Sequence, residues 1–442
     1  MWIELIILFT CIVIGARLGG IGLGTLGGLG LVIFVFVFGL PPGSPPGIVL
    51  GMIIAVITAL ASMQSAGGLD YLISFATKVM RKKPQYITFV APFVTYFLIL
   101  ASGTQHVIYA LLPVIAEVST KAGIRPERPM SISVTASMYG VISSPISAAT
   151  VALLGALVSY NISLLQIMIV IIPASILGLI VGTLSVAWRG KDLKDDPEYQ
   201  EKLKSGKIQE STAVVEMAKE KISSARNSLL IFLAAIVIVV IIGIFPELRP
   251  SYEMLSGKDS IIQKLEMGDA IMIIMLAAAG IMMIFFKAKP SEAVKGSIMN
   301  GGVVAVISIL GVSWMGSSFF EGNKSEIVGG ISGIIQQAPW VLALGLFVLS
   351  MLLFSQAATV VTLMPVGVAL GMPLWVLIAV YPAVNGFFFL PTYGTVLAAV
   401  SFDRTGTTKI GKYLLNHSFM LPGVVCVIAT TVFAFIISSF VL

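Results

Sequence analysis

The sequence predicts an all-α polytopic membrane protein made of two repeats with opposite orientation. Of its 442 residues, 57% are hydrophobic and 11% are charged, whereas soluble domains carry about 25% charged residues. Apolar runs of about 20 residues recur along the chain, which is the length of a membrane-spanning helix. The runs are continuous, so they predict helices and not the alternating strands of a β-barrel.

The expected spans follow one another in two matching series. Each series has three spans, a long apolar region, a span with an internal break and a last span. The first series is 2–16, 21–40, 46–66, 86–119, 130–157 and 164–188. The second is 227–245, 269–286, 299–320, 338–372, 373–400 and 414–441. We therefore expect repeats at 1–188 and 227–442, joined by a charged linker, 189–226, that is solvated and forms a short amphipathic helix.

The basic residues orient these spans, because Lys and Arg concentrate in cytoplasmic loops. Suppose that both termini lie outside, and that 86–119 and 338–372 each return to the side from which they enter. All but four of the 27 Lys and Arg residues then lie in the cytoplasm. The exceptions are Arg249, Lys258, Lys264 and Lys324. We therefore expect two re-entrant hairpins from opposite sides, an arrangement typical of secondary transporters.

Polar and helix-breaking residues interrupt the apolar segments at four places. Such residues are rare in a membrane unless they have a function. The breaks lie in the two hairpins and in the span after each hairpin, at corresponding positions of the two repeats. The candidate site residues in them are Ser102, Gly103, Thr104, Gln105 and His106; Ser143, Ser144, Pro145 and Ser147; Ser355, Gln356, Ala357 and Thr359; and Asn385, Pro391, Thr392, Tyr393 and Thr395.

The chemistry of these breaks predicts an anion site. A helix that begins inside the membrane presents free N–H groups and a partial positive charge. Hydroxyl and amide side chains add further donors, so four converging helix ends would bind two carboxylates. Helix packing is the alternative role for each cluster taken alone. A structural hydrogen bond is the alternative for His106, and aromatic packing is the alternative for Tyr393.

Several kinds of site are absent from the sequence. No Asp or Glu is expected in mid-membrane, since Glu117, Asp269 and Asp403 fall at the ends of spans. This argues against a carboxylate proton relay and against a cationic substrate, while sodium coupling through carbonyl oxygens stays open. The sequence has no nucleotide-binding loop, metal-ligand spacing or catalytic triad. We expect no enzymatic activity, cofactor, metal or nucleic-acid partner, and we expect Cys11 and Cys426 to be buried.

Motifs along the whole chain add a resemblance. They include Gly67-Gly68-Leu69-Asp70, Gly103-Thr104-Gln105-His106, Ile124-Arg125-Pro126-Glu127-Arg128-Pro129, Ser355-Gln356-Ala357-Ala358, Leu390-Pro391-Thr392-Tyr393 and Phe402-Asp403-Arg404-Thr405-Gly406-Thr407-Thr408. With these motifs the sequence resembles the bacterial anaerobic C4-dicarboxylate (Dcu-type) carriers of the ion transporter superfamily. It departs from them at Gln105, where many relatives are expected to have Gly, and after Asn385, where relatives are richer in tyrosine.

The resemblance implies alternating-access antiport of fumarate, succinate, malate and aspartate across the bacterial inner membrane during anaerobic respiration. It also implies a homodimer in which a transport domain moves like an elevator against a scaffold, with the four breaks as the substrate site. Two alternatives stay open. One is a sodium- or proton-coupled organic-anion symporter, and the other is a partner of a membrane sensor kinase that docks on the charged cytoplasmic loops.

Overall fold

The computed structural model of the chain is mostly helical. It describes residues 1–18, 21–45, 47–205, 222–256, 259–338, 340–353, 355–391, 393–411 and 415–442. Within these residues, six helices are long and apolar enough to cross a membrane. Two further pairs qualify when both helices of a bent pair are counted together. The prediction of a helical polytopic membrane protein is therefore confirmed.

The first half of the chain forms ten α-helices among the described residues. They are α1 (Trp2–Leu18), α2 (Gly22–Val32), α3 (Gly47–Ser65), α4 (Gly68–Lys82), α5 (Ile87–Ser102), α6 (Ile108–Lys121), α7 (Glu127–Ser143), α8 (Ala148–Ala156), α9 (Leu164–Val186) and α10 (Pro197–Lys204). The short α10 lies in the segment expected to be the linker. The order of helices and breaks follows the predicted order, with one addition, α4.

Helix α4 is amphipathic and was not expected as a helix. It is bent by 73° from α3. Its buried residues include Leu69, Ile73, Ala76 and Met80, whose spacing of three and four places them on one face of the helix. The same helix ends in Arg81 and Lys82. The basic residues after the third span therefore stand at the end of a helix and not in an extended loop.

The second half begins earlier than expected and contains the only described sheet. Its elements are α11 (Ile222–Ile244), β1 (Ser251–Ser256), β2 (Asp259–Lys264), α12 (Met267–Phe285), α13 (Pro290–Lys295), α14 (Ser297–Gln337), α15 (Trp340–Leu353), α16 (Gln356–Ala369), α17 (Leu374–Ala379), the 3-10 helix η8 (Tyr381–Phe388), α18 (Gly394–Phe402) and α19 (Met420–Val441). Strands β1 and β2 pair antiparallel, with Ser251 opposite Lys264. This hairpin was not predicted.

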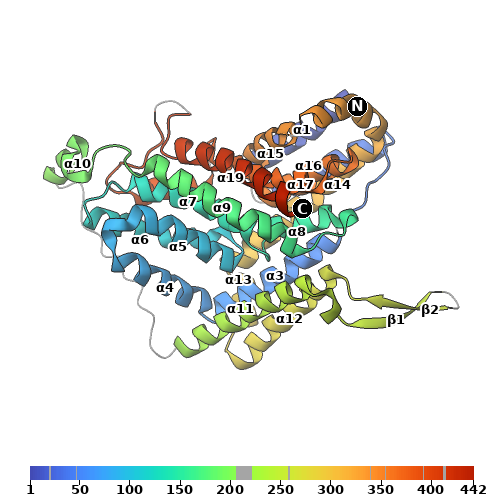
Figure 1. Ribbon diagram of the computed structural model, residues 1–442, viewed down its shortest axis with the longest axis horizontal. Coiled ribbons are helices and arrows are strands. Elements are labelled where there is room, and N and C mark those ends of the chain that lie inside the picture. The colour runs from blue at the N-terminus through green and yellow to red at the C-terminus, as the bar shows by residue number, and fades with distance from the viewer. Residues whose placement is uncertain are drawn as a thin grey trace.

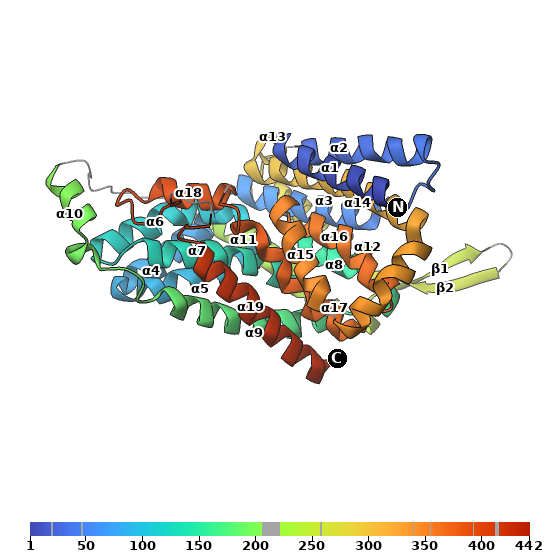
Figure 2. The same cartoon turned by 90° about the horizontal axis from the view of Figure 1, so that it is seen from above.

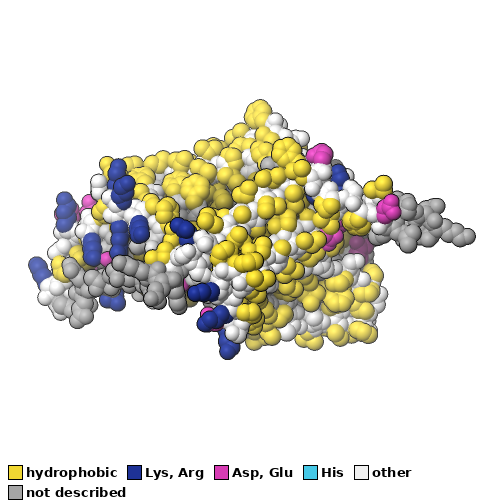
Figure 3. Space-filling model, turned by 90° about the horizontal axis from the view of Figure 1, so that it is seen from below, with side chains coloured by type: hydrophobic (Ala, Val, Ile, Leu, Met, Phe, Trp, Pro, Cys, Tyr) yellow, Lys and Arg dark blue, Asp and Glu magenta, His cyan; other side chains and the backbone are white. Residues whose placement is uncertain are grey.

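The molecule is elongated and its two ends differ in charge. Helix α10 stands at one end, and the β1–β2 hairpin stands at the other, toward which both termini also lie (Figure 1). We call these the basic end and the β end. Lys and Arg side chains gather toward the basic end in the face shown in Figure 3, while hydrophobic side chains cover its middle. The two ends of the molecule therefore differ in their content of basic side chains.

Close backbone contacts join α2 to α14. A Cβ atom on Gly24 would lie 2.1 Å from the carbonyl oxygen of Ile307, and one on Gly311 would lie 1.9 Å from the carbonyl oxygen of Gly24. A Cβ on Gly30 would meet a side chain instead, 2.2 Å from the sulfur of Met315. Helices α1, α2, α3 and α14 lie together in one layer (Figure 2). The glycines allow α2 and α14 to approach closely, as in other membrane helix pairs.

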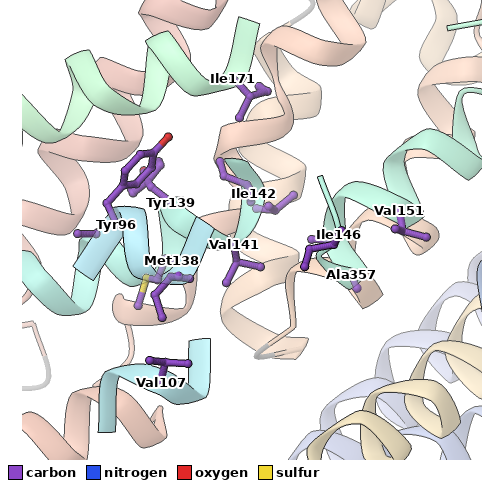
Figure 4. Packing of buried hydrophobic residues seen from close by; sticks show 14 of the residues in the cluster. Tyr96, Val107, Met138, Tyr139, Val141, Ile142, Ile146, Val151, Ile171 and Ala357 are labelled. Carbon is purple, nitrogen blue, oxygen red and sulfur yellow. The ribbon is translucent and has the colours of Figure 1, made fainter. Parts of the chain in front are cut away.

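The main core surrounds the break between α7 and α8. Tyr96, Tyr139, Ile142 and Ile146 are buried there, and Figure 4 shows Tyr96 and Tyr139 on one side of Ile142 and Ile146 on the other. Helix α5 packs on α7, and α9 packs on α19. The two cysteines are free and buried, as expected.

Candidate functional site

The first break lies between α5 and α6. Helix α5 ends at Ser102, and Gly103 has φ of +68°, a left-handed conformation that favours glycine. A Cβ on Gly103 would lie 2.9 Å from the side chain of Ile146 and 3.4 Å from the hydroxyl oxygen of Ser144. The turn at Gly103 therefore touches the second break, which contains both of those residues.

The second break lies between α7 and α8, which are bent by 42°. Ser144 is extended, with ψ of 125°, as is usual for a residue before proline, and here the next residue is Pro145. Ser147 then caps α8, because its hydroxyl accepts a hydrogen bond from the N–H of Thr150 at 3.1 Å. The hydroxyl of Ser143 donates to that of Ser175 at 3.1 Å. Local capping therefore explains how this helix stops and restarts.

The third and fourth breaks are built in a similar way. Ser355 caps α16 by accepting a hydrogen bond from the N–H of Ala358 at 3.2 Å. The following span ends as α17 and continues as η8, in which Asn385 leaves the helical region with ψ of 29°. The N–H of Gly386 donates to the hydroxyl of Ser350 in α15 at 2.8 Å. Helix α18 begins only at Gly394.

Two glutamines connect the breaks to adjacent residues of α7. The amide of Gln105 donates to the hydroxyl of Ser137 at 2.9 Å. Its carbonyl oxygen accepts from the hydroxyl of Tyr393 at 3.1 Å, so the first and fourth breaks meet. The amide of Gln356 donates to the carbonyl oxygen of Met138 at 2.8 Å and to the side-chain oxygen of Asn385. The first, third and fourth breaks therefore meet at residues 137 and 138 of α7, and the second break lies at the end of the same helix.

Other predicted residues have local partners or are not described. Thr395 lies 3.5 Å from the Gln105 amide. The hydroxyls of Ser102 and Thr359 donate to backbone oxygens of their own segments. Ala357 and Pro391 are buried without a polar side chain to offer, and Thr104 lines a small cavity described below. Thr392 and the side chain of His106 lie outside the described residues.

Two buried donors at these breaks are unpartnered. The hydroxyl of Ser144 and the side-chain nitrogen of Asn385 have no hydrogen-bond partner among the described residues. Both residues are fully buried. A buried polar atom without a partner costs about 1–3 kcal/mol, so such atoms are uncommon and call for a physical reason. Both atoms therefore have hydrogen-bonding capacity that the described residues do not use.

Ser137 is the principal residue that the sequence interpretation missed. It belongs to a row of buried hydroxyl residues in α7 that also includes Ser131, Ser133 and Thr135. The hydroxyl of Ser133 has no partner among the described residues. A run of small hydroxyl residues inside a span was the signal that could have identified this row. The apolar segments therefore contain a fifth polar cluster, next to the break at Ser143.

A small cavity of about 120 Å³ lies beside the first break. Gly103 and Thr104 line it from one side, together with Ile146 of the second break. Apolar residues of α3 and glycines of α14 line it from the other side. No group of three or more His, Cys, Asp or Glu that would hold a metal ion occurs in the described parts of the chain.

A separate ionic cluster at the basic end surrounds Arg125. Its guanidinium lies 2.7 Å from the carboxylate of Glu127 and 2.5 Å from that of Asp196. Burial alone would raise the pKa of Asp196, but the N–H of Tyr199 and the charge of Arg125 outweigh it and lower that pKa. The cluster ties the segment before α10 to the start of α7.

The loop between α18 and α19 joins the same cluster. The carboxylate of Asp403 accepts hydrogen bonds from the hydroxyl of Thr407 at 2.8 Å and the N–H of Thr408 at 2.6 Å. Glu127 accepts a hydrogen bond from the hydroxyl of Ser418 at 2.8 Å. Glu127 and Asp403 are both buried, so these contacts satisfy their charges. They tie the start of α7 to this loop.

His417 in this loop is buried and bonded at both ring nitrogens. Its Nδ1 accepts a hydrogen bond from the N–H of Phe419, and its Nε2 lies 3.2 Å from the carbonyl oxygen of Phe389. Nδ1 therefore lacks a proton, and Nε2 donates. Burial lowers the pKa of His417. The ring anchors the end of the fourth break to the loop.

Comparison with known proteins covers the whole chain. A family model described as anaerobic C4-dicarboxylate membrane transporter matches residues 1–442. The chain is 40% identical over 441 residues to the C4-dicarboxylate transporter DcuA of Wolinella succinogenes, with 99% of each protein covered. It is 39% identical over 446 residues to the anaerobic C4-dicarboxylate transporter DcuB of Escherichia coli O6:H1, covering 99% of this chain and 98% of that protein. It is 40% identical over 447 residues to DcuA of Escherichia coli K12, with 100% and 99% covered.

Proposed function

Because this chain belongs to the family of anaerobic C4-dicarboxylate membrane transporters, we propose that it exchanges one C4-dicarboxylate for another across the bacterial inner membrane. Fumarate, succinate, malate and aspartate are the substrates that we propose. The observation that carries the proposal is the convergence of four helix breaks, with two unpartnered donors, inside an apolar protein. Its relatives are named as transporters, so an enzymatic role has no support.

We propose that the two halves are inverted repeats. Matched contacts support this: α2 packs on α14, and α3 packs on α12. Gln105 bonds Ser137 in the helix after the first hairpin, and Gln356 bonds Asn385 in the helix after the second. The α5–α6 pair lies toward the basic end, and α15 and α16 lie toward the β end (Figure 1). With the basic end in the cytoplasm and both termini outside, these pairs are re-entrant hairpins from opposite sides.

In the proposed elevator, the hairpins and broken helices move as one body against a scaffold. The scaffold consists of α1–α3, α11, α12 and α14, and its α2–α14 contact is made by glycine backbones. The moving body is held together by the glutamine bonds to α7 and by the ionic cluster at Arg125 and Glu127. We further propose that the protein is a homodimer, as expected for such a scaffold.

The proposed site binds its two carboxylates at different breaks. The hydroxyl of Ser144 and the N-terminal end of α8 would bind one, and the amide of Asn385 with the N-terminal end of α16 would bind the other. The remaining predicted residues around them would complete the site. Neutral donors are enough to bind the two carboxylates, because a hydrogen bond to an ionised acceptor is about twice as strong as one between neutral groups.

The exchange proposal is tested by efflux of labelled succinate from proteoliposomes. We expect rapid efflux when fumarate or aspartate is present outside and little efflux without it. Efflux at the same rate in both conditions would contradict antiport. Efflux that needs sodium or a proton gradient, and not an external dicarboxylate, would favour the symporter instead.

The site proposal is tested by Asn385→Ala. The variant removes an amide whose oxygen accepts a hydrogen bond from Gln356 and whose nitrogen has no partner among the described residues. We therefore expect the KM for dicarboxylate to rise about tenfold or more. Asn323→Ala is a matched control, because that buried amide bonds a carbonyl oxygen within its own helix. Equal KM values for the two variants would exclude Asn385 from the site.

The sensor-kinase alternative makes a different prediction. It needs a protein that binds its partner through the charged loops without any flux. Co-purification of a kinase with a protein that gives no dicarboxylate exchange would support it.

A further inference from the structure

A cavity of about 840 Å³ lies at the β end, separate from the four breaks. Residues of α3, α11 and α12, which belong to the proposed scaffold, line one side of it. Residues of α8, α9 and α16, which belong to the proposed moving body, line the other. Val158 is among the lining residues and is 71% exposed, so the cavity reaches the protein surface.

The cavity extends toward the first break. Met52 of α3 and Ala152 of α8 line it. The small cavity beside the first break is lined by Ile53 and Ala148, together with Gly103. Ile53 directly follows Met52, and Ala148 precedes Ala152 by about one helical turn. The two spaces are therefore separated by about one turn of helix.

Arg249 is the basic residue that lines the larger cavity. One of its terminal nitrogens donates to the carbonyl oxygen of Leu265 at 3.2 Å. Its Nε is buried and has no hydrogen-bond partner within the described parts of the chain. A guanidinium carries five N–H donors and binds a carboxylate through two parallel hydrogen bonds. Arg249 is therefore held in place from one side, with an unpartnered N–H left for an anion.

Glu266 lines the same cavity with the opposite charge. It precedes the first turn of α12, and its side chain does not cap that helix. An anion in the cavity would be attracted by Arg249 and repelled by Glu266. Replacing each residue should therefore change anion affinity in opposite directions.

We propose that this cavity is the outer access route to the substrate site, and that Arg249 binds one carboxylate of an arriving C4-dicarboxylate there. The inference rests on the proposed function, which supplies the identity of the ligand. Only four Lys and Arg residues are expected on the outer side of the membrane, against 23 on the cytoplasmic side. A dianion that approaches the β end therefore meets few positive charges, and one of them lies in the cavity.

The first experiment measures exchange from the outer face alone. Right-side-out membrane vesicles are loaded with fumarate, and the KM for external labelled succinate is measured. We expect Arg249→Gln to raise this KM about five- to tenfold with little change in the maximal rate. Lys264→Gln, which removes an exposed charge on β2, should leave the KM within about twofold of the original. Glu266→Gln should lower it.

Arg249→Lys distinguishes binding through paired hydrogen bonds from attraction by positive charge alone. Lysine keeps the charge but loses the planar pair of donors, so its KM should fall between those of the original protein and of Arg249→Gln. A KM for Arg249→Gln equal to that for Lys264→Gln would overturn the inference. Absence of exchange in the original protein would instead contradict the proposed function.

The second experiment does not depend on the arginine variants. Ala156→Cys places a thiol in the wall of the cavity, and the two native cysteines are buried. A membrane-impermeant maleimide should label it from outside, and succinate should slow the labelling several-fold. Ser439→Cys, exposed near the end of α19, is the control that succinate should not protect. Labelling at position 156 that ignores succinate would overturn the inference.

Discussion

Replacement of Ser144 with alanine should separate stability from substrate affinity. The Ser144 hydroxyl is fully buried and has no partner among the described residues. Its removal therefore breaks no described hydrogen bond and relieves an unsatisfied group that costs about 1–3 kcal/mol. The empty variant should melt at the same temperature as the original protein or at a higher one.

The same change should weaken dicarboxylate binding. A hydrogen bond to a charged acceptor contributes about 1.5–3 kcal/mol, which corresponds to about a 10- to 100-fold rise in Kd. The assay is thermal unfolding in detergent over a range of succinate concentrations, combined with the KM for exchange. In the original protein succinate should raise the melting temperature, and in Ser144→Ala the same rise should need a higher concentration.

Ser228→Ala is the matched control for this experiment. Ser228 is equally buried in α11, but its hydroxyl donates to the carbonyl oxygen of Ala225 at 2.9 Å. Its loss should lower stability by about 1 kcal/mol and leave the KM unchanged. A Ser144→Ala protein with a lower melting temperature and an unchanged KM would refute the reasoning, because Ser144 would then be a structural residue.

Three further predictions concern the turn at Gly103 and the basic end. Gly103→Ala should lower the free energy of unfolding by about 1–2 kcal/mol, because a non-glycine residue would take the left-handed conformation, and it should also displace Ile146. Exchange should therefore slow more than in the control Gly123→Ala, where φ is +72° but no atom lies within 4 Å of the added Cβ. Equal exchange rates in the two variants would contradict a role for this turn. Burial lowers the pKa of His417, so the stability contributed by its neutral ring should be complete above about pH 6.5. That stability should be lost as the pH falls through the lowered pKa. Melting curves between pH 5 and 8 should show this loss, and His417→Asn should remove the pH dependence. The pKa of Asp196 is lowered, so the stability that its ionised carboxylate contributes should be complete above about pH 4 and disappear below the lowered pKa. Asp196→Asn should therefore lower the free energy of unfolding by about 1–2 kcal/mol at neutral pH and by little in acid. An equal effect at both pH values would contradict the ion pair.

The helix breaks were predictable because their causes are local. Gly103 is left-handed, and Ser144 is extended before Pro145. Such preferences act over one or two residues and can be inferred without a fold. The sequence could therefore locate the breaks at positions 103 and 145 to within a few residues.

The partners of the break residues were not predictable in the same way. Gln105 bonds Ser137, which is 32 residues away, and Gln356 bonds the carbonyl oxygen of Met138, which is 218 residues away. Every residue has a backbone carbonyl, so the sequence does not show which of them accepts a hydrogen bond. Only the packing of α7 between the two hairpins brings it within reach, so this part of the site needed the structure.

Helix α4 shows a different limit. Its apolar positions Leu69, Ile73, Ala76 and Met80 have helical spacing, so the signal was present. The charges among them made the segment look like a loop, because an interfacial or cytoplasmic helix lacks the long apolar run of a span. Hydropathy detects spans and overlooks amphipathic helices between them.

The glycines between α2 and α14 have a consequence for genetics. At Gly24 and Gly311 the two nearest obstructing atoms are backbone atoms, which no second mutation can remove. At Gly30 the obstruction is the side chain of Met315, which a second mutation can shorten. A selection for revertants should therefore recover Met315→Ala as a suppressor of Gly30→Ala, while Gly24→Ala and Gly311→Ala should revert only at their own codons.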